Sequence, residues 1–359
     1  MHPYDAILLL SFGGPEAPEE VVPFLRRVTA GRGIPDDRLE QVGQHYFLFG
    51  GRSPINDQNR ALIGALRAEL DARGDDTPVI WGNRNSAPFL TDALREAHAM
   101  GMRRLVAVTT SAYSSYSSCR QYREDLAAAV EELTAEGLKL SIDKIAPYAP
   151  RAGFRRANEV QVVEALRTLE GTPDEDIALL FVTHSIPEGM DATSGPGDGE
   201  GHLYQRQHLA LASALTDAAN AELGRDLVGE LVFCSRSGPP NQRWLEPDVN
   251  DRLRELAAAG RTAVVAAPIG FVSDHMEVAY DLDTEAAATA RDLGLRFVRA
   301  ATPGTDPVFV ADLVDAVAER AAEARGEAVA DLEGRMPSVC AAGCCPNLRS
   351  PRPALCGQD

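Results

Sequence analysis

The stretch PIGFVSDHMEVAYDLDTEA, residues 268–286, decides the fold. It completes the apolar run AVVAAPIGFV, which predicts a buried strand. Ser273 and Asp274 then interrupt this run, and a helical pattern follows them. Open α/β sheets bind ligands just beyond the carboxyl ends of their strands, where such a strand meets a helix. We therefore predict an α/β sheet with a ligand site at this point.

Acidic residues mark one face of the predicted helix. Glu277, Asp281 and Glu285 recur every four residues and so share a face, and His275 lies in the same first turn as Glu277. Like charges at this spacing weaken an isolated helix. Asp274 with Glu277 also matches a capping box, in which each side chain satisfies an unpaired amide at the helix start. The local pattern leaves two interpretations open, a capped helix with a solvated acidic face or a binding site.

Composition and charge restrict the class of protein. The chain has 359 residues, which suggests about two domains. Its net charge of −18 disfavours nucleic acid and anionic membranes as partners. No segment approaches the ~18 apolar residues of a membrane span, and the amino terminus leads straight into a strand without a signal peptide. We expect a cytoplasmic protein without stable membrane insertion, in which the six cysteines form no disulfide framework.

Strand-like and helix-like segments alternate along the whole chain. AILLLSF, residues 6–12, predicts a first buried strand, and ALIGALRAELDARG predicts an amphipathic helix. The scheme repeats up to LKLSIDKIAPYAPRAGF, an irregular segment near residue 150 that indicates a domain crossing. Such alternation implies parallel sheets covered on both faces. We predict an α/β protein of two doubly wound, Rossmann-like domains with a cleft between them. Their bounds are residues 1–150 and 151–312, followed by a closing helix and a cysteine-rich tail in residues 313–359.

A histidine ends another predicted strand of the second domain. DIALLFVTHSIP places His184 after an apolar run, and Pro187 stops the strand just behind it. A single histidine at such a place is more often structural. Together with Glu277 it gives an imidazole and a carboxylate at two strand ends that face one cleft. That pair suits divalent metal binding or proton transfer.

Several motifs resemble one known family. LSFGGP, GGRSPIN, TSAYSSYSSCRQY, HSIP, NQRWLEPDV and SDHMEVAYDLD, in this order and at these separations, are similar to those of ferrochelatases. The resemblance runs from about residue 7 to residue 317. It implies a chelatase-like fold and a lyase of haem biosynthesis that inserts ferrous iron into a free-base porphyrin and releases two protons. It makes His184 and Glu277 the catalytic pair, and it places His275 and Asp281 with them as metal-binding residues.

The residue types agree with that chemistry. A neutral imidazole such as that of His184 accepts a proton or coordinates iron. The Glu277 carboxylate is a hard ligand and a second base, and the acidic stripe offers a path for cations or protons. The sequence leaves open whether iron arrives on the His184 side or along the carboxylate side.

The resemblance also implies porphyrin contacts in the first domain. The residues that it assigns to porphyrin binding are Phe12, Tyr46, Ser53, Tyr122 and Arg52. Arg32 and Arg120 lie in the same loops, and guanidinium groups pair with propionates in a bidentate manner. The alternative for each of these residues is a loop side chain that makes only local bonds.

Two positions depart from the pattern of the family. Some relatives carry a tyrosine in place of Phe12, as an axial iron ligand in the product complex. Phenylalanine has no donor atom, so Phe12 can only pack against the porphyrin ring. His45 stands where relatives of the Gram-positive kind have arginine.

The tail VCAAGCCPNLRSPRPALCG is the second informative region. Such cysteine density in a cytosolic protein indicates metal. By resemblance to the cluster-containing ferrochelatases, we expect Cys119, Cys340, Cys344 and Cys345 to hold a two-iron, two-sulfur (2Fe-2S) cluster, leaving Cys356 unused. All-cysteine ligation suits such a cluster. A structural zinc ion is the alternative.

We expect coproporphyrin III as the substrate rather than protoporphyrin IX, giving coproheme. Coproporphyrin carries four propionates, and the entrance loops hold several arginines and hydroxyls. FLFGG is the only short apolar segment suited to collecting a porphyrin from a membrane. The cluster-type tail is also shared with coproporphyrin users, and other haem-pathway enzymes are candidate partners.

Three other functions remain as alternatives. A cobalt or nickel chelatase acting on a related tetrapyrrole would lack SPIN, NQRWLEPDV and the cysteine tail. A non-catalytic two-domain clamp would bind haem or a metal complex without turnover. An iron–sulfur redox sensor would have a vestigial cleft, against which the intact His184 and Glu277 argue.

Overall fold

The computed structural model describes residues 1–31, 33–237, 241–332 and 334–358. The first half of the chain forms β1 (Ala6–Ser11), α1 (Pro18–Val28), α2 (Asp36–Phe47), α3 (Ile55–Ala72), β2 (Val79–Asn83), α4 (Leu90–Ala99), β3 (Arg104–Thr109), η1 (Tyr116–Arg120), α5 (Gln121–Ala135) and β4 (Ser141–Lys144). The second half forms α6 (Ala152–Arg167), η2 (Asp174–Asp176), β5 (Ile177–His184), α7 (Glu188–Ala192), α8 (Leu203–Leu223), β6 (Gly229–Cys234), α9 (Val249–Ala258), β7 (Ala263–Ala267), η3 (Glu277–Ala286), α10 (Ala287–Asp292), β8 (Arg296–Arg299) and α11 (Pro307–Ala324).

The described residues form two four-stranded sheets in which every pairing is parallel. The strand orders are β2-β1-β3-β4 and β6-β5-β7-β8. Their apolar strands are buried along nearly their whole length; every residue of β1 and β7 is buried. Strands buried in this way belong to sheets with helices on both faces. The predicted α/β fold with two parallel sheets is confirmed.

The strand order places two points of the chain where ligands bind in such sheets. β1 pairs with both β2 and β3, and β5 pairs with both β6 and β7. The connection that leaves β1 therefore runs to one side of its sheet and the connection that leaves β3 runs to the other, and the same holds for β5 and β7. The crevice beyond the carboxyl ends of two such neighbouring strands is the usual binding place. His184 is the last residue of β5, and η3 follows β7.

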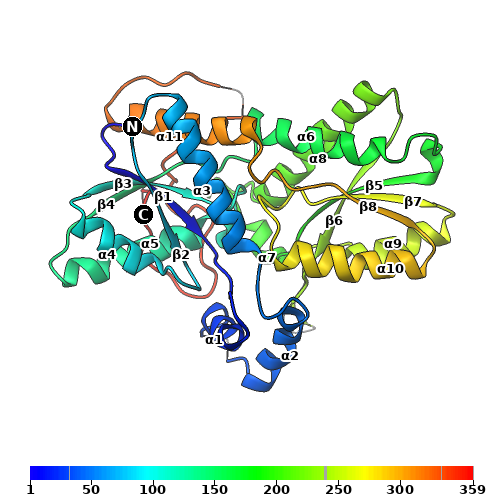
Figure 1. Cartoon of the computed structure of the whole chain (residues 1–359), viewed down its shortest axis with the longest axis horizontal. Helices are drawn as coiled ribbons and strands as arrows, with labels where there is room; N and C mark the ends of the chain where they lie inside the picture. Colours follow the sequence, from blue (N-terminus) through cyan, green and yellow to red (C-terminus); the bar gives the residue numbers. More distant parts are fainter. Residues whose placement is uncertain (32, 238–240, 333, 359) are drawn as a thin grey trace.

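The two halves lie side by side and share apolar packing (Figure 1). One buried cluster includes Leu9 and Val106 of the first sheet together with Leu179 and Val265 of the second. The closing helix α11 packs on α3 of the first half and on α6 of the second. The hairpin of α1 and α2 stands below both sheets and has a small apolar core of its own around Phe24.

The structure of residues 268–286 differs from the prediction in two respects. The strand ends at Ala267, because Pro268 has no amide hydrogen to continue the ladder. Residues 268–272 instead form a turn, in which the amide of Ile269 donates to the carbonyl of Ala267. The helix that follows is a π-helix, a rare form that is frequently found at functional sites.

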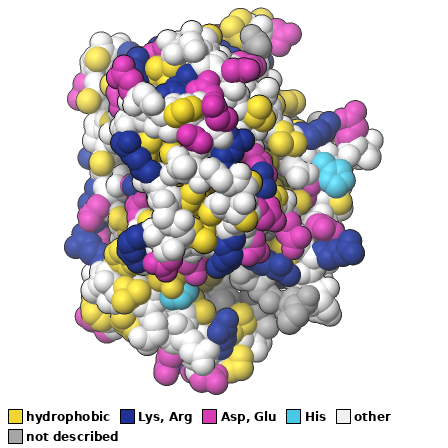
Figure 2. Space-filling model, turned by 90° about the vertical axis from the view of Figure 1, so that its right-hand side faces the viewer, with side chains coloured by type: hydrophobic (Ala, Val, Ile, Leu, Met, Phe, Trp, Pro, Cys, Tyr) yellow, Lys and Arg dark blue, Asp and Glu magenta, His cyan; other side chains and the backbone are white. Residues whose placement is uncertain are grey.

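No helix in the described ranges is both long and apolar enough to cross a membrane. On the described surface in Figure 2, acidic and basic side chains are interspersed with small apolar areas.

Candidate functional site

His184 presents an imidazole at the carboxyl end of β5. Its Nδ1 lies in short hydrogen-bond contact with the carbonyl oxygen of Ser185. A ring nitrogen against a carbonyl must donate, so the neutral ring carries its proton on Nδ1. Nε2 then has the lone pair with which a histidine accepts a proton or binds a cation.

His275 and Glu277 form a direct pair at the start of η3. His275 Nδ1 lies 2.6 Å from Glu277 Oε2. Burial raises the pKa of Glu277, but the charge of His275 and its hydrogen bond outweigh burial and lower that pKa to about 2; the charge of His184 acts in the same direction. Burial lowers the pKa of His275, and Glu277 more than reverses this, so it is raised. Glu277 is therefore a permanent carboxylate within electrostatic range of two imidazoles.

The capping-box interpretation of this turn is excluded. The N-cap residue of η3 is Met276, which makes no side-chain cap bond, and the amide of Glu277 instead lies 3.3 Å from His275 Nδ1. The Asp274 carboxylate instead accepts hydrogen bonds from Arg299 and from the hydroxyl of Thr302.

Asp281 lies one turn further along η3 and is a proton acceptor near neutral pH. The Ser235 hydroxyl donates to its Oδ2. Burial raises the pKa of Asp281 to about 7; the bond from Ser235 opposes the rise, and the negative charges of Glu277 and Glu285 add to it. Ser235 follows β6 with a φ of 61°, a left-handed conformation uncommon for a residue with a side chain. The sequence prediction did not include Ser235, although its place after an apolar strand was a signal.

Helix α2 of the first half lies near the acidic residues of η3. Burial raises the pKa of Tyr46 well above its usual value, and the charges of Glu277 and Asp281 add to the rise, so the phenol lies within electrostatic range of both carboxylates. The neighbouring His45 ring stacks on Tyr280 of η3, with ring centroids 3.8 Å apart and an interplanar angle of 11°. Helix α2 thus contacts η3 through the rings of His45 and Tyr280.

Aromatic rings continue from Tyr46 to the end of β1. The Phe24 ring packs edge-on against Tyr46 at 5.8 Å and against Phe12 at 6.0 Å between centroids. The guanidinium of Arg84 lies 5.6 Å from the Phe12 ring and 4.5 Å from the Tyr122 ring. Tyr122 is buried beneath Arg84, so it contacts that cation rather than an open surface. Arg84 was missed by the sequence prediction, although it lies in the polar segment that ends β2.

The other predicted porphyrin contacts lie in different surroundings. Ser53 is buried, and its Oγ is 3.4 Å from the amide of Ile55. Arg52 is half exposed and pairs with Asp57 at 2.5 Å. Arg120 is turned away toward the tail, where it contacts Glu124 and the carbonyl oxygen of Cys344. Arg32 lies outside the described residues.

The four cysteines predicted as ligands come together in one group, the cysteine cluster: Cys119, Cys340, Cys344 and Cys345. The Cys119 thiol contacts that of Cys340, which contacts Cys344. Cys344 Sγ in turn lies 3.8 Å from Cys345 Sγ. Cys356 is engaged elsewhere, because its Sγ donates to the carbonyl oxygen of Ile142 at 3.3 Å.

The cysteine cluster joins the tail to both halves of the molecule. Cys119 belongs to η1 of the first half. The amide of Cys345 donates to the carbonyl oxygen of Gly195, which belongs to the second half. Contact with Cys340 and burial raise the pKa of the Cys119 thiol well above its usual value, whereas Lys144 and Arg123 lower it. Among the described residues, no three or more His, Cys, Asp or Glu side chains surround a point that could hold one metal ion.

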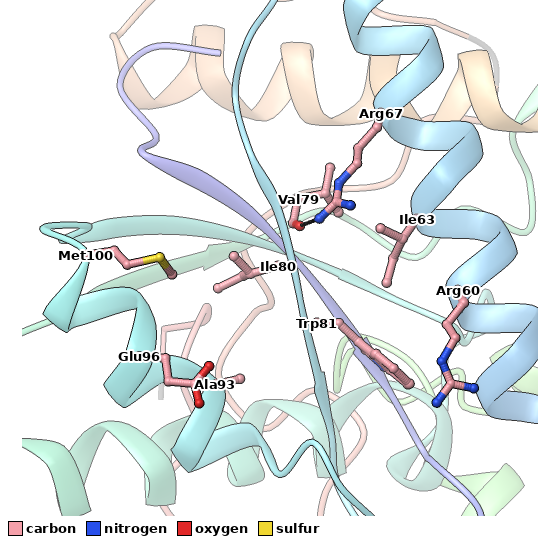
Figure 3. Close-up of a pocket in the computed structure, with 9 residues that line it drawn as sticks. All are labelled: Arg60, Ile63, Arg67, Val79, Ile80, Trp81, Ala93, Glu96 and Met100. Atoms are coloured by element: carbon pink, nitrogen blue, oxygen red, sulfur yellow. Dashed lines mark hydrogen bonds between the residues drawn. The ribbon is translucent and has the colours of Figure 1, made fainter.

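An open cavity lies elsewhere, at the outer edge of β2 (Figure 3). It has a volume of about 460 Å³ and lies between α3 and α4, with Trp81, Arg60 and Met100 in its wall. None of the predicted site residues lines it. The candidate site is therefore located by the strand ends and their charged groups and not by this cavity.

Two parallel α/β halves, with imidazoles and carboxylates beyond the strand ends of one and aromatic rings beyond those of the other, define a metal chelatase. The family model for ferrochelatase matches residues 4–321. The chain belongs to the ferrochelatase family.

Curated relatives match over almost their entire length. The coproporphyrin III ferrochelatase of Streptomyces coelicolor is 54% identical, with 99% of this chain and 97% of that protein covered. The protein of the same name from Leifsonia xyli subsp. xyli is 50% identical, covering 99% and 94%. Among solved structures, SirB from Bacillus subtilis with Fe³⁺ matches with a TM-score of 0.50 and 13% identity over 89% of this chain and 97% of that one. At that identity the likeness concerns the fold alone.

Proposed function

We propose that this protein inserts ferrous iron into coproporphyrin III to give coproheme, as a cytoplasmic enzyme of haem biosynthesis. Support comes from relatives that carry the name coproporphyrin III ferrochelatase at 44–54% identity. The observation that carries the proposal is the His275–Glu277 pair beyond the strand ends of the second sheet, with His184 and Asp281 within electrostatic range of Glu277. The reaction takes up one Fe²⁺ and releases two pyrrole protons, so it needs ligands for a cation and acceptors for protons.

The pKa shifts divide these tasks between the carboxylates. Glu277, whose pKa is about 2, stays ionised and is the ligand that meets the cation. Asp281, whose pKa is about 7, exchanges protons at neutral pH and is suited to carry a pyrrole proton away. A cation at Glu277 replaces the charge of protonated His275, which can then release its proton. His184 provides Nε2 as the base or ligand nearest the strand end.

The porphyrin would lie between the two halves, which we divide at residues 1–150 and 151–312, with 313–359 as the closing segment. Phe12 and Tyr46 supply an aromatic wall on the side of the first half. Arg52, which is half exposed, would meet a propionate at the rim by exchanging Asp57 for a substrate carboxylate, and the neighbouring Ser53, which is buried, would contact the porphyrin only if that loop opened. Tyr122 and Arg120, both buried, would act by supporting these loops.

The assay that tests this proposal directly supplies Fe²⁺ and a porphyrin without oxygen. Loss of the free-base spectrum and growth of the metalloporphyrin spectrum reports insertion. Binding without this spectral change would favour the non-catalytic clamp.

The raised pKa of Asp281 predicts how the rate of iron insertion depends on pH. Below pH 7 its carboxylic acid is neutral and neither attracts a cation nor accepts a proton, so kcat/KM for Fe²⁺ should rise as the pH rises through about 7. Asp281→Asn should remove that rise and leave a low rate throughout. Asp283→Asn is the matched control on the same helix, because Asp283 pairs with Arg299 instead. An unchanged pH profile in Asp281→Asn would remove Asp281 from the reaction.

We also propose that the cysteine cluster holds a 2Fe-2S cluster. The residues fit that group because four thiols lie in one continuous chain of contacts, as all-cysteine ligation requires. The charges of Lys144 and Arg123 oppose the rise in pKa that thiol contacts and burial cause at Cys119. When bound, the cluster supplies a cross-link between the tail and both halves. Because a site formed only in the folded chain adds its binding free energy to stability, we assign it a structural or regulatory role.

Cys119→Ser tests this assignment. The variant should lose the colour of the cluster and have a lower thermal midpoint, because the bridge from η1 to the tail is broken. Cys356→Ser should keep both, since that thiol bonds to a carbonyl oxygen. If elemental analysis finds zinc and no inorganic sulfide, the 2Fe-2S assignment is wrong and the site holds a structural zinc ion.

A further inference from the structure

The main chain of His184 rests on a buried network that the proposed chemistry does not use. The Tyr204 hydroxyl donates to the carbonyl oxygen of His184 at 2.8 Å, and it lies 2.9 Å from Thr183 Oγ1. Thr183 Oγ1 lies 2.9 Å from Nε2 of His208. Tyr204 and His208 stand one turn apart on α8, and the side chains of this network are buried. The network therefore runs from α8 to the strand end that carries the imidazole of His184.

Counting protons shows that the network has none to spare. His208 Nδ1 lies 2.7 Å from the carbonyl oxygen of Tyr204, to which it must donate. Burial lowers the pKa of His208 to about 3, so the ring is neutral and Nε2 accepts. Thr183 gives its hydroxyl proton to Nε2, so the single phenol proton of Tyr204 is shared between the carbonyl oxygen of His184 and Thr183 Oγ1. Removing one hydroxyl leaves a buried polar atom without its partner, which costs more than one ordinary hydrogen bond contributes.

The same network reaches the loop that leads to η3. The Tyr113 ring, from the first half, stacks on His208 with centroids 3.6 Å apart, and its hydroxyl donates to the carbonyl oxygen of Ile269 at 2.6 Å. The next residue, Gly270, passes directly over Thr183, since a Cβ at Gly270 would lie 2.1 Å from Thr183 Oγ1. The ends of β5 and β7 are thus held against each other by one set of buried contacts.

We propose that Thr183, Tyr204 and His208 are positioning residues that fix His184 relative to Glu277. The inference rests on the proposed function, because it takes these two side chains as the groups that meet iron. Neither Tyr204 nor Thr183 touches the substrate in this account. They act by holding two strand ends in register, and a displacement of ~1 Å at reacting groups lowers a rate by ~10²-fold.

Tyr204→Phe removes one oxygen atom from the network and is the first test. We expect kcat for iron insertion to fall about 10- to 100-fold, on the scale of a sub-ångström to 1 Å displacement. The dissociation constant for coproporphyrin III, measured by fluorescence quenching, should stay unchanged.

Tyr148→Phe is the matched control. The Tyr148 hydroxyl is also buried and donates to a strand-end carbonyl oxygen, that of Thr109 in the first sheet, at 2.8 Å. Both variants lose the same kind of hydrogen bond and should show similar falls in thermal midpoint, but only Tyr204→Phe should lower kcat. A merely structural network would lower kcat in both variants or in neither, and either result overturns the proposal.

A second pair of variants decides the question if Tyr204→Phe fails to fold. Thr183→Val keeps the branched shape and removes the hydroxyl, so it should lower kcat, whereas Thr183→Ser keeps the hydroxyl and should restore most of it. Equal rates in these two variants would contradict the proposal.

Co²⁺ binding separates this inference from the proposed function. Titration of the protein with Co²⁺, followed by its visible absorbance, should give weaker binding in Tyr204→Phe than in the wild type or Tyr148→Phe. A wild type that inserts no iron would refute the proposed function, and the Co²⁺ titration would still test the positioning. The same Co²⁺ affinity in all three proteins would refute the positioning role of this network.

Discussion

Replacing His184 by alanine is expected to abolish metal insertion while leaving porphyrin binding intact. The imidazole stands at the carboxyl end of β5, with Nδ1 engaged by the carbonyl of Ser185 and Nε2 as its acceptor. Its loss removes a positioned base or ligand, so turnover should fall by at least ~10²-fold. The porphyrin should still bind, because the aromatic wall of Phe12 and Tyr46 belongs to the other half.

The His184→Ala experiment needs rate and binding measured on the same sample. Iron insertion is followed by absorbance under anaerobic conditions, and porphyrin binding by fluorescence quenching. His98→Ala on α4 is the control for a histidine far along the chain from the strand ends. Turnover in His184→Ala at the rate of His98→Ala would remove His184 from the mechanism.

Glu277→Gln should also lower turnover by at least ~10²-fold, the usual scale for a positioned acid or base. The substitution keeps the size of the side chain but removes the charge that His275 and His184 stabilise. Stability should change little, because a partly exposed pair contributes less than ~1 kcal/mol. A rate loss without a comparable loss of thermal midpoint identifies a functional carboxylate.

Glu285→Gln provides the comparison for Glu277→Gln. Glu285 lies on the same helix and receives a hydrogen bond from Asn250, further from the imidazoles. If Glu277→Gln behaved like Glu285→Gln in rate, the charge at Glu277 would have no special role and the assignment would fail.

Much of the architecture could be predicted because it is written in local patterns. The apolar runs of β1, β5 and β7 and the amphipathic helices between them indicate parallel sheets without any knowledge of contacts. The positions of His184 and Glu277 after two such runs follow from the same pattern. The convergence of Cys119 with the tail came from family resemblance, since more than two hundred residues separate them along the chain.

The remainder depends on tertiary contacts that no local pattern carries. The π-helix of η3 has the same acidic spacing as an α-helix, so its sequence does not distinguish the two. Ser235 becomes relevant only because β6 ends beside η3, and Arg84 because it lies between two aromatic rings. His208 looks like any helical histidine until its contact with Thr183 is seen.

The most direct test of the central claim is the anaerobic reaction of the wild-type protein with Fe²⁺ and each of two porphyrins. Coproporphyrin III should be converted to its iron complex, with the free-base absorbance lost as the metalloporphyrin spectrum grows, and protoporphyrin IX should react far more slowly. Insertion of iron into neither porphyrin, with porphyrin bound and its spectrum unchanged, would contradict the assignment as a ferrous-iron chelatase.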